Sequence, residues 1–157
     1  MDLILWRHAE AVPERPGQSD LERALTPKGE RQAQRMAQWL NRHLPDSTRI
    51  VASPARRCQQ TARALDRKFM TVEEIGPGVD PENLLQVARW PEGAEPVLLV
   101  GHQPTLGLVA SLLLTGMAQP WTIKKGAVWW FRQRDGKGEG EGVGEVLLHA
   151  VQAPDGL

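Results

Sequence analysis

The sequence predicts an α/β fold: a three-layer sandwich whose central sheet is mostly parallel, flanked by helices, with a β-hairpin near the C-terminal end. Short apolar runs at residues 3–6 and 97–100 have the composition of strands buried on both faces, and residues 49–52 form a further short candidate strand. Helix-type segments follow each of them, which is typical of a parallel sheet with helical crossovers. The last two strand-type segments, at 126–134 and 145–151, have no helix-type segment between them and predict the hairpin.

The composition is that of an ordinary globular protein. The chain has 157 residues, of which 41% are hydrophobic and 24% charged. We expect residues 1–157 to form a single domain without a large inserted lid. The formal net charge is zero, so no overall basic field exists to bind nucleic acid or an anionic membrane. Any anion-binding site must therefore be local.

Cysteine count and hydropathy exclude further classes. The single cysteine, Cys58, rules out an intramolecular disulfide framework and clusters of the CxxC metal-binding kind. No apolar run reaches the roughly 18 residues that would indicate a membrane span. The first residues lack the basic segment and long apolar region of a secretory signal. We therefore expect a cytoplasmic protein without a metal or cofactor.

The first predicted helix begins near residue 27. Thr26 is a suitable N-cap and Pro27 suits the first helical position. Apolar residues then recur at helical spacing and predict one buried face: Ala33, Met36, Ala37, Leu40 and Leu44. His43 lies on or near that face, so we interpret it as structural. Pro45 ends the helix.

A second helix is predicted after the strand at 49–52. Ser53 and Pro54 again have the types of an N-cap and a first helical residue. The apolar stripe consists of Cys58, Ala62, Leu65 and Phe69. Cys58 is interpreted as core packing, because the next arginine in its segment, Arg63, is one position short of the C-x5-R loop of cysteine phosphatases.

The rest of the chain continues the alternation of strand and helix. An edge strand is predicted at 71–75, a short helix at 81–90, and an amphipathic helix from about residue 106 to Gly116. The glycine-rich stretch 136–144 between the two hairpin strands reads as a flexible, polar linker, and its role is left open.

Three predicted strands end in residues that can bind an anion. His8 and Arg7 follow the first strand, Arg57 stands early in the helix after the second, and His102 follows the third. Ligands of open α/β sheets lie beyond the carboxyl ends of the strands. We therefore expect these four side chains to converge at one edge of the sheet, although a solvated arginine and loop histidines are the plainer interpretation of each one alone.

Arginines and histidines without an acidic ligand set suit a phosphoryl group. Arginine matches phosphate oxygens bidentately, and phosphoryl transfer mainly needs positioning and charge stabilisation. A neutral His8 could attack phosphorus and become transiently phosphorylated. A metal site is the poorer interpretation, because the arginines would repel the cation. A Ser-His-Asp hydrolase is disfavoured too, since the chain has no G-x-S-x-G nucleophile elbow.

Four ordered motifs support this chemistry: RHAEA at 7–11, LTPKGERQA at 25–33, SPARRCQQTA at 53–62 and VLLVGHQPTL at 97–106. In these the chain resembles the histidine phosphatase superfamily, the phosphoglycerate-mutase-like group, and in its short length the SixA-type phosphohistidine phosphatases. The resemblance runs from residue 3 to about residue 114. It implies a metal-independent enzyme that releases inorganic phosphate.

The resemblance also implies the roles of the site residues. His8 is the expected phosphoryl acceptor, and Arg7, Arg57 and His102 are expected to hold the phosphoryl oxygens. Arg57 is preferred to its neighbour Arg56 because the functional arginine of the family stands in a fixed position before the Gln-Thr pair. Ala9 departs from the family pattern, which usually has glycine there, and adds a methyl group beside the nucleophile.

The proton donor is a separate question. Larger relatives that cleave phosphate esters use an acidic residue in the loop after the second helix. Glu74 lies in the corresponding region, with Glu10 and Asp80 as alternates. An exposed carboxylate without a role is an equal interpretation of Glu74. Phosphohistidine relaxes the requirement, because imidazole leaves more easily than an alkoxide.

The expected substrate follows from how little chain is available to cover the site. The stretches 14–23 and 69–97 are short, so we expect an open site suited to a phosphorylated side chain on another protein. The leading hypothesis is protein phosphohistidine. The alternatives are a phosphatase of small phosphorylated metabolites or nucleotides, and a phosphoprotein-binding module without turnover. Lys124 and Lys125 could form a basic rim for a partner, or simply be a solvated strand end.

Overall fold

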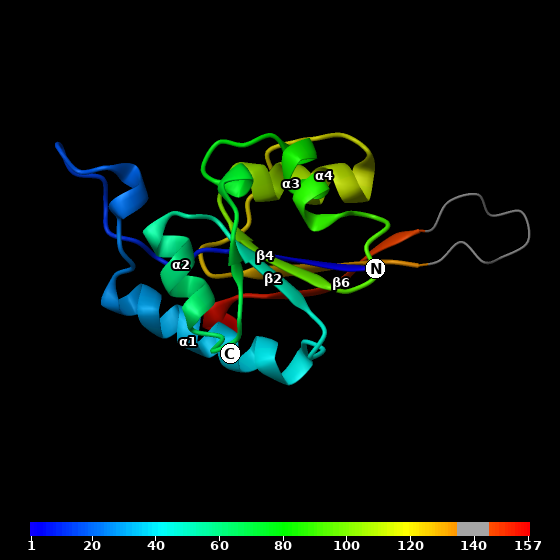
Figure 1. The fold of residues 1–157 in the computed structure, drawn as a ribbon, viewed down its shortest axis with the longest axis horizontal. Helices are drawn as coiled ribbons and strands as arrows, with labels where there is room; N and C mark the ends of the chain where they lie inside the picture. The colour runs from blue at the N-terminus through cyan, green and yellow to red at the C-terminus, as the bar shows by residue number, and fades with distance from the viewer. Residues whose placement is uncertain (135–144) are drawn as a thin grey trace, which may run out of the picture.

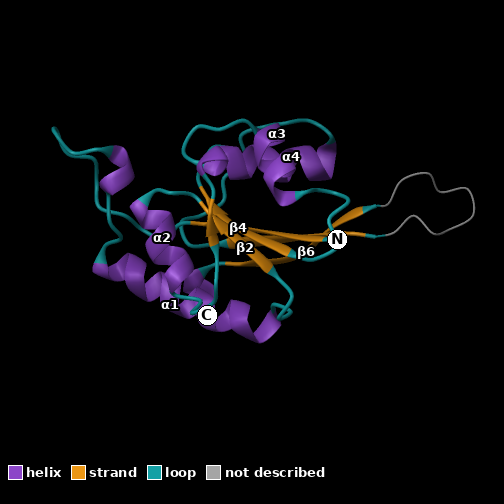
Figure 2. Cartoon of the chain, viewed as in Figure 1, coloured by secondary structure: helices purple, strands orange, loops and turns teal. Residues whose placement is uncertain are grey.

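A six-stranded sheet with the strand order β3-β2-β4-β1-β5-β6 forms the centre of the protein. Figures 1 and 2 show this sheet between two layers of helices. The computed structural model describes residues 1–134 and 145–157, so the whole of the predicted linker at 136–144 lies outside the described residues. The strands are β1 (Asp2–Arg7), β2 (Arg49–Ala52), β3 (Met70–Thr71), β4 (Val97–Gly101), β5 (Val128–Gln133) and β6 (Val146–Gln152). The first four pair in parallel, and β5 and β6 add an antiparallel hairpin.

Helices cover both faces of this sheet and complete three layers. The helices α1 (Pro27–His43) and α2 (Arg56–Arg63) lie on one face, and α3 (Pro81–Ala88) and α4 (Thr105–Thr115) on the other (Figure 1). Short 3-10 helices occur at Asp20–Glu22, Glu73–Ile75 and Pro154–Gly156. The predicted three-layer α/β sandwich with its mostly parallel sheet and C-terminal hairpin is confirmed. No helix in the described ranges is both long and apolar enough to cross a membrane.

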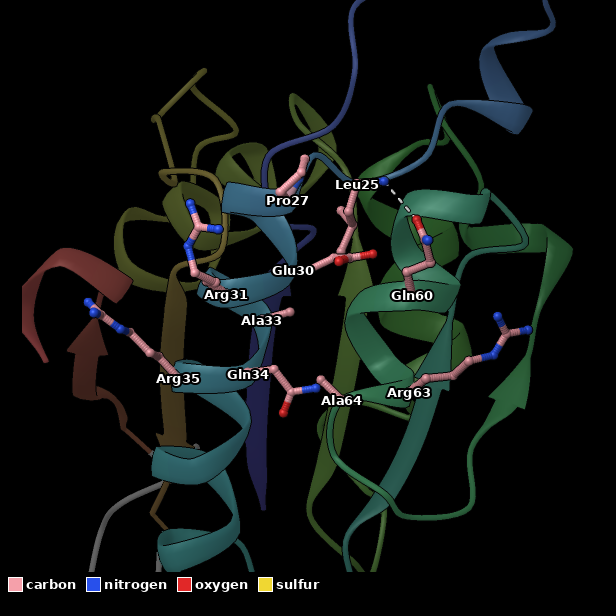
Figure 3. A pocket seen from close by; sticks show the side chains of 10 residues that line it. All are labelled: Leu25, Pro27, Glu30, Arg31, Ala33, Gln34, Arg35, Gln60, Arg63 and Ala64. Atoms are coloured by element: carbon pink, nitrogen blue, oxygen red, sulfur yellow. Dashed lines mark hydrogen bonds between the residues drawn. The ribbon is translucent and has the colours of Figure 1, made fainter.

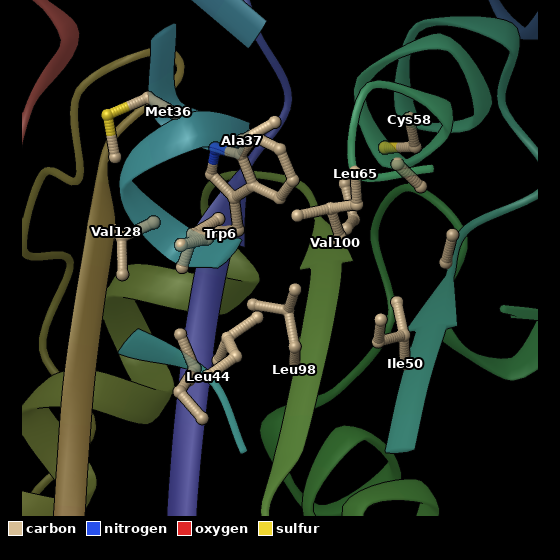
Figure 4. Packing of buried hydrophobic residues seen from close by; sticks show 14 of the residues in the cluster. Trp6, Met36, Ala37, Leu44, Ile50, Cys58, Leu65, Leu98, Val100 and Val128 are labelled. Atoms are coloured by element: carbon tan, nitrogen blue, oxygen red, sulfur yellow. The ribbon is translucent and has the colours of Figure 1, made fainter. Parts of the chain in front are cut away.

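The unbroken apolar run of β1 is explained by burial on both faces of the sheet. Ile4 and Trp6 pack in the cluster under α1 and α2, while Leu3 and Leu5 pack in the cluster under α3 and α4. Figure 4 shows the first of these clusters, in which Trp6 lies against α1. All four side chains are inaccessible to solvent, which contributes roughly 2 kcal/mol each to the stability of the fold.

The two predicted helix starts have different outcomes. Thr26 is the N-cap of α1, and its Oγ1 accepts the amide of Gly29 at 2.9 Å, as predicted. The prediction of Ser53 as the N-cap of α2 is wrong, because α2 begins two residues later and Ala55 occupies the cap position. The hydroxyl of Ser53 instead lies 2.7 Å from Nε2 of His102. The Ser53 hydroxyl therefore pairs with a histidine of the site instead of capping α2.

Two other elements are shorter than the sequence predicts, and one residue predicted on or near a buried face is exposed. The edge strand predicted at 71–75 is reduced to β3, because the chain turns into the 3-10 helix that buries Ile75 beneath α3. The helix α2 ends at Arg63, so Phe69 packs from a loop rather than from the helix. His43 is exposed rather than part of the buried face of α1, and its Nδ1 lies 2.7 Å from Trp39 O.

Candidate active site

The register of the two central strands brings the histidines together. β1 and β4 run in parallel with Arg7 opposite Gly101, so His8 and His102 leave the same edge of the sheet. The His8 amide donates to Gly101 O at 3.2 Å, and the two imidazole rings lie 5.5 Å apart between centroids. The two histidines therefore lie side by side at the carboxyl ends of neighbouring parallel strands, as the sequence predicts.

A small cavity of about 250 Å³ opens at this edge. It is lined by His8, the predicted phosphoryl acceptor, and by the three residues predicted to hold the phosphoryl oxygens, Arg7, Arg57 and His102. Its wall is completed by residues to which the sequence assigned no catalytic part: Ala11, Arg23, Pro77, Gln103 and Lys125. Arg23 and Lys125 bring two further cations, so the cavity is strongly electropositive in a chain of zero net charge.

Backbone atoms of the segment before β5 hold the end of β1 in place. Arg7 Nη1 donates to Ile123 O at 2.8 Å, and Trp6 Nε1 donates to Gly126 O at 3.0 Å. The amide of Gly126 lies within 3.1 Å of the carbonyls of both Arg7 and His8. Gly126 has a φ of +74°, which glycine adopts without strain. The backbone of His8 is thus fixed from both sides, by β4 and by this segment.

The hydrogen bond of His8 decides which of its nitrogens is available. Nδ1 lies 2.8 Å from Ala9 O. A carbonyl oxygen can only accept, so Nδ1 carries the proton, and Nε2 keeps its lone pair. The side chain is 7% exposed. Burial, together with the charges of Arg57 and Arg7, lowers the pKa of His8 to about 4, so the imidazole is neutral and nucleophilic at neutral pH.

His102 is held in the complementary tautomer. Arg57 Nη2 donates to its Nδ1 at 3.3 Å, so Nδ1 is unprotonated and Nε2 carries the hydrogen that points to Ser53 Oγ. Burial and the neighbouring Arg57 lower the pKa of His102 to about 3. The sulfur of Cys58 lies 3.5 Å from Nε2 of the same ring. Burial raises the pKa of this thiol to about 12, in agreement with the predicted packing role.

Arg57 is buried rather than solvated, with 3% of its surface exposed. Asp20 fixes it twice: Nη1 donates to the backbone carbonyl at 2.8 Å and Nη2 to the carboxylate at 3.1 Å. The same carboxylate accepts from Arg23 Nε at 2.9 Å. Burial alone would raise the pKa of Asp20, but the hydrogen bonds from Arg23 and Arg57 hold it below its usual value. Asp20 therefore places one negative charge against two guanidinium groups of the site.

The structure accommodates Ala9, which stands where the family usually has glycine. Ala9 is fully buried, and its amide donates to Thr61 Oγ1 at 3.1 Å. The Thr61 hydroxyl in turn donates to Arg57 O at 2.7 Å, which links the backbone after His8 to α2. The added methyl group packs in a small apolar cluster with Leu25 and Ala33.

The three candidate proton donors lie outside the lining of the cavity. Glu74 is exposed on the 3-10 helix before Pro77, which does line it. Glu10 is engaged with Thr26 Oγ1 at 2.7 Å, and Asp80 is exposed before α3. Among the described residues, no group of three or more His, Cys, Asp or Glu side chains is arranged to hold a metal ion. Of the two lysines considered as a basic rim, Lys125 lines the cavity, whereas Lys124 Nζ lies 3.9 Å from Asp155 Oδ2.

Comparison with known proteins agrees with this geometry. The model of the histidine phosphatase superfamily (branch 1) matches residues 3–77. The chain is 33% identical to a phosphohistidine phosphatase SixA homolog of Haemophilus influenzae over 129 residues, which cover 72% of this chain and 77% of the relative. The chain belongs to the histidine phosphatase superfamily. It is therefore a phosphatase, which acts on a phosphorylated substrate and releases phosphate.

Solved structures extend the likeness over almost the whole chain. A SixA structure from Agrobacterium tumefaciens has a TM-score of 0.79 at 25% identity and covers 98% of this chain and 97% of its own. A phosphoserine phosphatase mutant from Entamoeba histolytica, in complex with phosphoserine, has a TM-score of 0.70 at 18% identity, with 99% and 98% covered. That second likeness shows the shared fold alone. Membership of the superfamily removes the alternative of a binding module without turnover.

Sequence reasoning missed Arg23, Asp20 and the backbone segment at 123–127. From the sequence, the stretch 14–23 is expected only to leave the site open, yet its end forms a 3-10 helix in which Ser19 Oγ accepts the amide of Leu21 at 3.3 Å. The Ser-Asp pair at 19–20 is a capping signal that could have indicated this turn. No comparable signal marks the carbonyl of Ile123, because every residue has one.

Proposed function

We propose that this chain removes the phosphoryl group from phosphohistidine on another protein, with His8 as the transient acceptor. The observation that carries the proposal is the hydrogen bond from His8 Nδ1 to Ala9 O, which leaves the lone pair of Nε2 free in a neutral ring at a cationic cavity. Arg7 and Arg57 would hold the phosphoryl oxygens. His102 would join them by redirecting its Nε2 hydrogen from Ser53 Oγ to the phosphoryl group. Arg23 joins them as a fourth oxygen ligand in this proposal.

The reaction proceeds in two displacements. The lone pair of His8 Nε2 forms a bond to phosphorus while the P–N bond of the substrate breaks, and the leaving imidazole takes up a proton. Water then attacks the phosphorylated His8, the second P–N bond breaks, and inorganic phosphate leaves. Each well-placed donor to the phosphoryl oxygens contributes about 3 kcal/mol to lowering the barrier.

The size of the cavity favours a side chain presented by a protein. Its volume of about 250 Å³ accommodates a phosphoryl group and the ring that carries it. Sites that enclose a whole small molecule are usually larger, roughly 300–1,000 Å³. The stretch 14–23 contributes Asp20 and Arg23 but no larger cover. An open site excludes water poorly, which disfavours hard alkyl phosphate esters.

Glu74 remains our candidate proton donor for substrates that need one. Its 3-10 helix leads within three residues to Pro77 at the cavity wall. We expect Glu74→Gln to slow hydrolysis of an alkyl phosphate and to leave phosphohistidine hydrolysis almost unchanged, because imidazole needs little help from an acid. Equal losses on both substrates would contradict this division.

The proposal is tested by trapping and by substrate comparison. During turnover, wild-type protein should carry acid-labile, alkali-stable phosphate, His8→Ala should carry none, and His43→Ala, altered at an exposed position away from the cavity, should match wild type. A chelator should leave turnover unchanged. The ratio of kcat/KM values then decides the substrate: a preference of about tenfold or more for any small ester over a phosphohistidine protein would overturn the assignment.

A further inference from the structure

A second, larger hollow lies beside the catalytic cavity, between α1 and α2 (Figure 3). Its volume is about 730 Å³. Its inner surface is largely apolar, formed by Leu25, Pro27, Ala33 and Ala64. We call it the α1–α2 groove. None of the steps proposed for His8 uses it.

Arginines flank the α1–α2 groove on both sides. Arg31 and Arg35 stand on its α1 side and Arg63 on its α2 side, and all three are exposed (Figure 3). Glu30 is the one carboxylate among its lining residues, so the balance is basic. The pattern of an apolar floor between two basic rims is that of a groove for an amphipathic helix with acidic flanks.

Basic and acidic residues are also unevenly distributed along the chain, with the basic ones concentrated near the groove. Between residues 27 and 69 there are ten Lys or Arg against three Asp or Glu, whereas residues 72–95 carry six Asp or Glu against one arginine. The first segment includes α1 and α2, and the second includes α3 on the opposite face of the sheet (Figure 1). A protein of zero net charge therefore presents one basic helical face, on the side of the groove.

The α1–α2 groove adjoins the catalytic cavity through one short extended segment. Arg23 lines the cavity, and two residues later Leu25 lines the groove, a separation of roughly 7 Å along extended chain. Leu25 is held there by its amide, which donates to Gln60 Oε1 at 2.7 Å (Figure 3). A chain segment lying in the groove can therefore extend to the mouth of the catalytic cavity.

We propose that the α1–α2 groove docks an acidic, amphipathic helix of the phosphorylated protein substrate. This proposal rests on the proposed function, because it assumes that the phosphoryl group arrives on a protein. The apolar side of the helix fills the groove, and its acidic flanks face Arg31 and Arg35 on one side and Arg63 on the other.

The test compares a groove variant with a charge-matched control. Arg31→Glu/Arg63→Glu reverses one charge on each rim. Arg42→Glu/Arg134→Glu makes the same total change at two exposed arginines outside the groove lining. Because long-range steering depends on total charge, the control separates local docking from the overall field. Gln34→Trp fills the groove without changing any charge.

The probe is a synthetic helical peptide with leucines on one face, glutamates on both flanks and one chemically phosphorylated histidine. A second peptide has glutamine at every glutamate position, and free phosphohistidine serves as a substrate too small to reach the groove. For the glutamate peptide we expect kcat/KM to fall about tenfold or more in the groove variant and in Gln34→Trp. The control variant, and free phosphohistidine in every variant, should stay within about twofold of wild type.

Binding separates the docking surface from the chemistry. In the His8→Ala background, fluorescence anisotropy of the labelled, unphosphorylated glutamate peptide should show binding that the groove variant and the glutamine peptide both lose. Binding with this pattern but without hydrolysis of the phosphorylated peptide supports the docking surface and overturns the proposed function. If the phosphorylated glutamate peptide is hydrolysed and both groove variants hydrolyse it at the wild-type rate, the docking proposal is overturned and the proposed function is retained. Absence of both overturns both.

Discussion

Acidification should destabilise this fold through the two imidazoles of its active site. Burial and the neighbouring arginines lower the pKa of His8 from 6.5 to about 4 and that of His102 to about 3. In both cases the folded-state pKa lies below the unfolded-state pKa. The stabilisation is therefore fully present above about pH 6.5, and it is lost as the pH falls from there towards 4.

The size of the effect follows from proton uptake. Between pH 7 and pH 5 each of these two histidines takes up about 0.7 of a proton in the unfolded chain and almost none in the folded protein. Each imidazole thereby lowers the free energy of unfolding by about 2 kcal/mol over this interval, and the pair by about 4 kcal/mol. Small domains have roughly 5–15 kcal/mol in total, so the loss is large.

Urea unfolding followed by tryptophan fluorescence, at pH 7 and pH 5, measures this directly. We compare wild type with His102→Asn, which removes one of the two titrating groups, and with His43→Asn as the exposed control. Wild type and the control should lose about 4 kcal/mol between the two pH values, and His102→Asn about 2 kcal/mol. If His102→Asn loses as much free energy of unfolding between pH 7 and pH 5 as wild type does, the imidazole of His102 is not kept neutral in the folded protein.

Four further outcomes follow from the same geometry. The kcat/KM for a chromogenic phosphate ester, measured in short assays after a pH jump, should stay level down to about pH 5 and fall near pH 4 as His8 is protonated; an acid limb centred above pH 6 would contradict this. Iodoacetamide at pH 8 should label Cys58 in urea but not in the native protein, because the thiol is buried with a pKa of about 12; rapid native labelling would show it to be accessible. Gly107→Ala should lower the free energy of unfolding by about 2 kcal/mol or more, because the new Cβ would lie 1.6 Å from Trp121 O, and an unchanged urea midpoint would refute that close approach. Asp20→Asn should lower the inhibition constant of inorganic phosphate several-fold, because the site loses a negative charge that competes for two arginines; weaker phosphate inhibition would mean that Asp20 chiefly positions them.

The sheet and its sequence of elements were accessible to sequence reasoning because their signals are local. The unbroken apolar run of β1 and the spacing of the α1 face each depend on burial that repeats over a few residues. The boundaries of α2 were not accessible, since Ser53 has the type of an N-cap but its hydroxyl pairs with a histidine 49 residues away. A side chain that satisfies a distant partner gives no indication of this in its own neighbourhood.

The convergence of His8, Arg57 and His102 was predictable from topology, because parallel strands deliver their carboxyl ends to one edge. Their electrostatic environment was not predictable in this way. Arg23 lines the cavity because Asp20 and the Val12 carbonyl hold its guanidinium, and those contacts depend on the path of an irregular segment. Irregular backbone has no periodicity from which such a path can be inferred.

The attachment of the end of β1 to residues 123–127 bears on how enzymes of this kind diversify. Every bond that this segment makes to Trp6, Arg7 and His8 uses its own backbone N–H or C=O groups, which almost any sequence supplies. The side chains there are not needed to hold the backbone of His8 in place, apart from the glycine that the positive φ favours at 126. Residues 123–127 can therefore change most of their side chains while the bonds that position His8 are kept. A search for motifs would pass over this segment even though the position of His8 depends on it.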